Sequence, residues 1–169
     1  MKAKRSVRAL LWLAVLATMA MIFSFSCQNG ETSLNTSGGV VSWLIGVLDR
    51  EFDQRPAQQQ QALLDAFTTL VRKGAHFSEY ALLGGLLCLL CHSYALSHAR
   101  LVAWLVATIY AGTDELHQLW VSERSGSIVD VGIDSAGALF GVLVAWALVW
   151  AWMRCRRGRN AREARADRC

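Results

Sequence analysis

The chain is poor in charged residues and in residues that interrupt helices. Asp, Glu, Lys and Arg make up 18% of its 169 residues, and it contains one proline. A soluble domain normally carries about a quarter of its residues as charged side chains. With 54% hydrophobic residues, the chain is too apolar to be intrinsically disordered. A single proline and five cysteines exclude a collagen-like chain and a disulfide-rich secreted scaffold.

What the sequence has instead is long apolar blocks. They span residues 9–26, about 75–96, 101–121 and 128–153. At 1.5 Å per residue, each block can cross a hydrocarbon core of about 30 Å. The last three blocks reach that length only if their ionisable residues lie inside the span. We therefore predict an all-α integral membrane bundle of four transmembrane helices.

Basic residues set the expected orientation. Of 17 Lys and Arg residues, twelve lie in the N-terminal segment, in the connection at Arg100 and in the C-terminal tail. Because basic residues concentrate on the cytoplasmic side, we predict a multi-pass protein whose two termini are both inside (N-in/C-in). The arginine-rich tail fits anionic lipid of the inner leaflet better than nucleic acid.

The blocks divide the chain into four parts. Residues 1–27 are a basic segment and a first transmembrane helix, which we expect to be retained because Phe25 suits a lipoprotein signal poorly. Residues 28–71 form an outside loop, in which 28–39 reads as irregular and 40–48 as a short interfacial helix. Residues 72–153 form a three-helix core, and 154–169 a basic cytoplasmic tail.

Polar residues recur near one end of each core span. On the second span, His76, Glu79 and Tyr80 share a face at helical spacing. Counted along the helices, the polar groups of all three spans lie about 20 to 30 Å from the inner boundary. They therefore form one layer near the outer face. Such residues usually serve a function, although they can also cross-link helices at about 0.6 kcal/mol per contact.

This layer has the side chains that phosphoester chemistry needs. Histidine beside carboxylates supplies a general acid and base. Arg72, Lys73 and Arg124 can hold a phosphate. A divalent metal is possible but optional, because no spacing here matches a metal-binding motif. Small residues elsewhere, including Gly137 and Gly141, are expected to be packing surfaces.

Three ordered blocks resemble the VanZ-like family of small bacterial membrane proteins. They are Arg72-Lys73-x-x-His76-x-x-Glu79-Tyr80, Asp114-Glu115-Leu116-His117-Gln118 and Arg124-Ser125-Gly126-Ser127-x-x-Asp130-x-x-x-Asp134-x-x-Gly137. Ser26-Cys27-Gln28 is similar to a Ser-Ser-Gln triplet that often follows the first span of that family. The resemblance implies a bacterial inner-membrane protein. The founding member is associated with resistance to teicoplanin-type antibiotics, and lipid-headgroup chemistry has been proposed for the wider family.

From the residues and the resemblance together, we expect an enzyme acting on phospholipid or polyprenyl-phosphate headgroups by phosphoester hydrolysis or transfer. The expected catalytic residues are His76, Glu79, Asp114, His117 and Asp134. In that set, either histidine is the nucleophile or base and a carboxylate orients it. The expected substrate-binding residues are Lys73, Tyr80, Glu115, Gln118, Arg124 and Asp130. The alternative is a non-catalytic envelope protein that binds a cell-wall lipid precursor and gives glycopeptide resistance.

Overall fold

The computed structural model describes residues 5–27, 30–119 and 127–166, with the side chains of 30–37 and 160–166 left aside. Its elements are five α-helices and one short 3-10 helix: α1 (Arg5–Ser26), α2 (Gly30–Leu48), η1 (Phe52–Gln54), α3 (Ala57–Ser93), α4 (Ala99–Gln118) and α5 (Ile128–Ala166). The described residues contain no β-strand, which confirms the prediction of an all-α fold.

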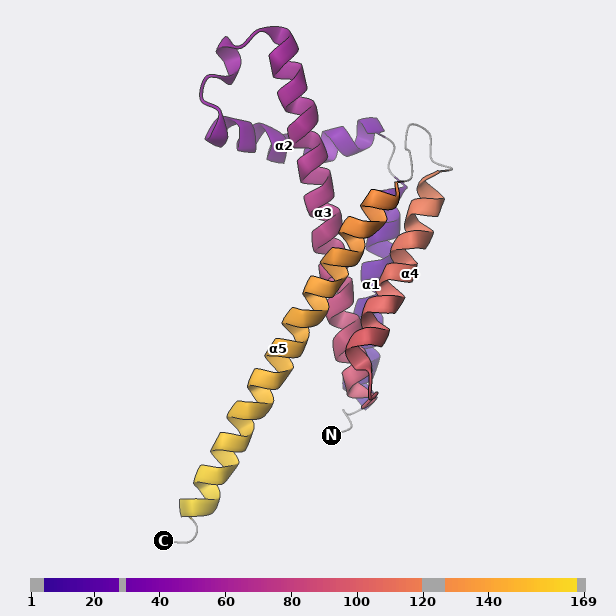
Figure 1. Cartoon of the computed structure of the whole chain (residues 1–169), viewed down its shortest axis with the longest axis vertical. Coiled ribbons are helices and arrows are strands. Elements are labelled where there is room, and N and C mark those ends of the chain that lie inside the picture. Colours follow the sequence, from indigo (N-terminus) through magenta and orange to yellow (C-terminus); the bar gives the residue numbers. More distant parts are fainter. Residues whose placement is uncertain (1–4, 28–29, 120–126, 167–169) are drawn as a thin grey trace.

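The helices form a bundle with two protruding ends (Figure 1). The helices α1 and α4 run beside the C-terminal half of α3, and α5 crosses α3 obliquely. The N-terminal half of α3 extends beyond the bundle, where α2 lies across it. Helix α1 begins and α5 ends at the same end of the bundle, because the four long helices α1, α3, α4 and α5 alternate in direction.

Among the described residues, three segments are long and apolar enough to cross a membrane. They are Arg5–Ser26, Ala57–Ser93 and Ile128–Arg159. Helix α4 falls short of the same hydropathy because Asp114 and Glu115 lie in its C-terminal half. The structure therefore supports a membrane protein, whereas the fourth span stays a prediction.

Small residues bring the backbones of α3 and α5 into contact. A Cβ atom on Gly137 would meet the carbonyl oxygen of Phe77, and one on Gly141 would meet that of Ala81. Gly84 of α3 faces the backbone of α5 in the same way. Such close approach is what small residues permit between membrane helices. The prediction that Gly137 and Gly141 form a packing surface is confirmed.

The core lies where α1, α3, α4 and α5 meet. Helix α4 presents a stripe of fully buried alanines, Ala103, Ala107 and Ala111, spaced by one helical turn. Cys88 and Cys91 are buried in the same apolar cluster and carry free thiols.

Two helices are longer than the sequence predicted. The prediction of an irregular segment over 28–39 is wrong from Gly30 onward, because α2 begins there. Intrinsic helix propensity predicts local structure only weakly, because tertiary contacts often override it. Helix α2 is anchored farther along by the buried side chains of Val41 and Ile45. Helix α5 continues past residue 153 to Ala166, through a tail rich in Arg and Ala, which favour helix.

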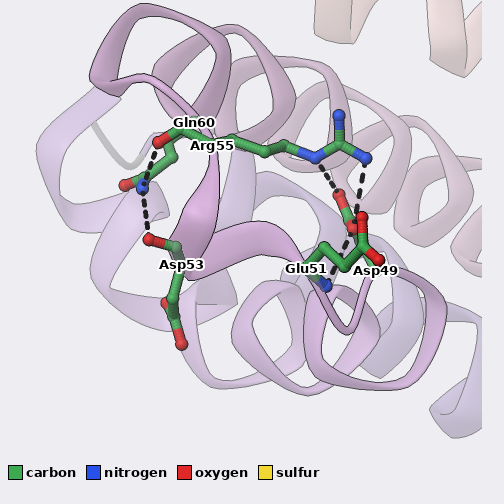
Figure 2. A network of polar contacts seen from close by, with 5 residues as sticks. All are labelled: Asp49, Glu51, Asp53, Arg55 and Gln60. Carbon is green, nitrogen blue, oxygen red and sulfur yellow. Dashed lines mark hydrogen bonds and ion pairs between the residues drawn. The ribbon is translucent and has the colours of Figure 1, made fainter.

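Hydrogen bonds close the turn between α2 and α3 (Figure 2). The guanidinium of Arg55 donates to both carboxylate oxygens of Asp49, at 2.8 and 3.3 Å, and the backbone N–H of Glu51 donates to Asp49 at 3.3 Å. The Gln60 amide donates to the carbonyl oxygens of Asp53 and Arg55. These contacts help to hold α2 across the N-terminal half of α3.

Arginine and aromatic side chains gather at the opposite end of the bundle. Arg8 donates to the carbonyl oxygen of Ser93 at 3.0 Å, and its guanidinium lies 4.5 Å from the centre of the Tyr94 ring. Arg100 lies 4.8 Å from the ring centre of Trp146. Aromatic residues and snorkelling arginines are typical of a membrane boundary.

Candidate functional site

A polar cavity of about 330 Å³ lies between α3, α4 and the start of α5. Side chains from three separate chain segments converge on it, and its lining comprises Thr69, Arg72, Lys73, His76, Glu115, Gln118, Ser127, Asp130, Ile133 and Asp134. Both cations and carboxylates therefore face one space. The sequence placed six of these residues in the candidate site, namely Lys73, His76, Glu115, Gln118, Asp130 and Asp134.

Asp134 is the most deeply buried acid in the lining. It is 1% exposed, and neither of its carboxylate oxygens has a hydrogen-bond partner among the described residues. One turn earlier, Asp130 forms an ion pair of 2.9 Å with the ammonium of Lys73. A buried carboxylate without a donor loses its hydration at considerable cost. Asp134 is therefore a ready acceptor for a ligand that carries N–H or O–H groups.

A buried hydrogen-bond network joins α1 to α4 beside the cavity. The hydroxyl of Ser26 donates to Asp114 Oδ2 at 2.7 Å, and the Gln118 amide donates to Ser26 Oγ at 3.2 Å. Sequence reasoning did not include Ser26 among the site residues. The signal that could have identified it was the Ser-Cys-Gln triplet at residues 26–28, because Ser26 is the serine of that triplet.

Tyr80 and Glu79 lie behind the lining, on the side of Asp114. Tyr80 is fully buried, and its ring centre lies 6.2 Å from that of Tyr110. Its hydroxyl is within electrostatic range of Asp114 and Asp134. Glu79 is within electrostatic range of Asp114 as well. The carboxylates of α3, α4 and α5 thus form one cluster beside the cavity.

The two candidate histidines occupy different positions. His76 lines the cavity, whereas the ring of His117 packs against Phe23 of α1, with ring centres 4.8 Å apart. Glu115 accepts a hydrogen bond of 2.9 Å from the backbone N–H of Ser127 and so ties α4 to the start of α5. Arg124, the predicted phosphate ligand, lies outside the described residues.

The donor set does not form a ready metal site. Within residues 5–27, 30–119 and 127–166, no group of three His, Cys, Asp or Glu side chains is arranged to hold a metal ion. The described side chains place an imidazole, carboxylates and two cations around a common space. These groups can carry out acid–base chemistry and can pair with charged groups of a ligand.

The chain matches the model of a known protein family. A family model described as VanZ/LLP1 matches residues 11–151, from α1 through most of α5. It covers far more of the chain than the three motif blocks alone. No curated protein and no solved structure match the chain.

Proposed function

Because the chain belongs to the VanZ/LLP1 family, we propose that it is an enzyme of the bacterial inner membrane that acts on phospholipid or polyprenyl-phosphate headgroups. The observation that carries the proposal is the polar cavity inside a bundle of apolar helices. A site that combines an imidazole, carboxylates and cations suits hydrolysis or transfer at a phosphoester. Its place beside membrane-length helices favours a substrate held in the bilayer.

In the proposed reaction, the headgroup enters the cavity and its phosphoryl group lies against Arg72 and Lys73, with Arg124 as a further cation. Arginine can bind phosphate with two parallel hydrogen bonds, and lysine acts as a point charge. His76 serves as the nucleophile or general base because it is the candidate histidine that lines the cavity. A base must come within hydrogen-bond reach of its substrate, directly or through one water.

Neighbouring groups assist His76 from the carboxylate cluster. Glu79, Asp114 or Asp134 orients a histidine or water, and the bond from Ser26 fixes the Asp114 side chain. His117, packed on Phe23, then supports the site from the side of α1. Glu115, Gln118 and Asp130 complete the walls of the binding site, and Tyr80 supports them from within the bundle.

We also propose the four-span, N-in/C-in arrangement. Arginines near the start of α1, the start of α4 and the late part of α5 all lie toward one end of the bundle, as an inner boundary requires. Helix α4 serves as the fourth span because Asp114, Glu115 and Gln118 are buried within the bundle rather than facing lipid.

Helix α2 is the proposed interfacial helix on the outside. It lies across the protruding half of α3 and buries Val41 and Ile45. Four of its large apolar side chains are exposed, namely Val40, Trp43, Val47 and Leu48. A helix with such a face can rest in the headgroup region beside the cavity.

The test is turnover by matched histidine variants. Purified wild type, His76→Ala and His92→Ala are incubated with phospholipids and polyprenyl phosphates, with and without chelator, and products are read by mass spectrometry. His92 is the control because it is exposed at the far end of the same helix. We expect wild-type and His92→Ala protein to release or exchange headgroups, and His76→Ala to be about 10²- to 10⁴-fold slower. Saturable lipid binding without turnover would instead favour the non-catalytic, precursor-binding alternative.

A further inference from the structure

We propose that the cavity selects a headgroup in which a phosphoryl group is joined through two carbons to a primary ammonium. The phosphoryl group lies against Arg72 and Lys73, and the ammonium donates to Asp134. This inference rests on the proposed function and adds the class of substrate to it. It also assigns Asp134 to substrate recognition rather than to orientation of a histidine.

The argument starts from the unsatisfied carboxylate. Asp134 is 1% exposed, lines the cavity and has no hydrogen-bond partner for either oxygen among the described residues. Buried polar groups are nearly always hydrogen-bonded, so an exception needs a reason. A ligand with N–H donors supplies the missing partners. A primary ammonium is well suited because it has three donors and carries the opposite charge.

The balance of charges in the lining also favours an ammonium. Among the described residues of the lining, Arg72 and Lys73 face three carboxylates, those of Glu115, Asp130 and Asp134. A headgroup with only a negative phosphodiester would add a net negative charge and would bring no cationic group to these carboxylates. A zwitterionic headgroup adds none, and it places each of its charges beside a group of opposite sign.

The positions of these groups match a short ligand. Lys73 is held by Asp130 at 2.9 Å. Asp130 and Asp134 are four residues apart on α5, about 6 Å along the axis. The cation that binds phosphate and the carboxylate that binds ammonium are thus separated by little more than one turn. A two-carbon linker bridges groups at this spacing, whereas a longer headgroup would have to fold back.

The same geometry distinguishes a primary ammonium from a quaternary one. Choline carries a positive charge but no N–H group, so it leaves the oxygens of Asp134 without a donor. The described residues of the lining include no Phe, Tyr or Trp, although the faces of such rings are what commonly bind quaternary ammonium. Phosphatidylethanolamine should therefore bind more tightly than phosphatidylcholine with the same acyl chains.

Lipid binding measured without turnover tests the inference. The full-length protein in detergent is titrated with phosphatidylethanolamine, phosphatidylglycerol and phosphatidylcholine of identical chains, and occupancy is read by native mass spectrometry. Wild type should bind phosphatidylethanolamine at least tenfold more tightly than the other two. In Asp134→Asn, which preserves the shape of the side chain, this preference should disappear. Asp65→Asn, at an exposed position on α3, should retain it.

The outcomes separate this inference from the proposed function. Equal binding of the three lipids by wild type, or a preference that survives in Asp134→Asn, overturns the ammonium site and leaves headgroup turnover to be judged by its own assay. Absence of binding for every phospholipid overturns the ammonium site and restricts the proposed function to polyprenyl-phosphate headgroups. A further arm uses soluble phosphoethanolamine as competitor. Displacement of the lipid confirms that the headgroup is recognised, and failure to compete at saturating concentration overturns recognition through the headgroup.

Discussion

Alanine at position 141 would place a methyl group against the backbone of α3. The Cβ of such a residue would overlap the carbonyl oxygen of Ala81, and a helix backbone has no rotamer by which to move aside. The axes of α3 and α5 would have to separate. Since these two helices form two walls of the polar cavity, the substitution should disturb the site as well as the fold.

A second glycine on α5 provides the matched control. Gly132 has nothing within 4 Å of the position of its missing Cβ. Both Gly→Ala changes gain about 1 kcal/mol of helix propensity, so this contribution cancels between them. The difference measures the overpacking at the crossing, which typically costs about 1–3 kcal/mol. We expect Gly141→Ala to be less stable than Gly132→Ala by that amount.

The free energy of unfolding in mixed micelles, obtained by titration with a denaturing detergent, measures this difference. A difference of 1.4 kcal/mol is tenfold in the unfolding equilibrium constant, which such a titration resolves. If the two variants unfold at the same detergent fraction, the backbone contact between α3 and α5 does not hold the bundle together, and the proposed geometry of the cavity is refuted with it.

Two further predictions concern polar contacts. Ser26→Ala removes the 2.7 Å bond to the buried Asp114 and should lower the free energy of unfolding by about 1–3 kcal/mol, whereas the exposed Ser24→Ala should change it little; equal effects would contradict the network. Outside the membrane spans, hydrogen bonding from Arg55 lowers the pKa of Asp49. Their pairing should therefore persist above the ordinary aspartate pKa and be lost as pH falls through the folded value. Carboxyl NMR titration should show the Asp49 pKa rise in Arg55→Gln, and an unchanged pKa would contradict the pairing.

The class of fold could be predicted because it depends on local patterns. Apolar blocks predicted long helices, and α5 begins at Ile128 as expected. The spacing of Gly137 and Gly141 predicted a close helix contact, which is present. The start of α2 was mispredicted because Ser, Thr, Asn and Gly resemble a loop in composition. Helix α2 packs against α3, and a local sequence pattern does not reveal such a contact between separate helices.

The candidate site could be predicted only in part. Helical spacing grouped His76 with Glu79 and Tyr80, but it does not tell which side chains of other helices a histidine ring contacts. In the structure, α1 covers His117 with Phe23, whereas His76 faces the cavity. Ser26 was missed for the same reason, since its partner Asp114 lies 88 residues away in the sequence. Contacts between helices that are far apart in the sequence can be identified only once the fold is known.

Headgroup chemistry by the wild-type protein is the most direct test. The protein is reconstituted into vesicles that contain phosphatidylethanolamine, phosphatidylglycerol and a polyprenyl phosphate, and lipid products are followed by mass spectrometry over time. We predict loss or exchange of a headgroup at a rate proportional to the amount of folded protein. Vesicles whose lipids remain unchanged, although the protein is folded and correctly inserted, would contradict an enzymatic role for this cavity.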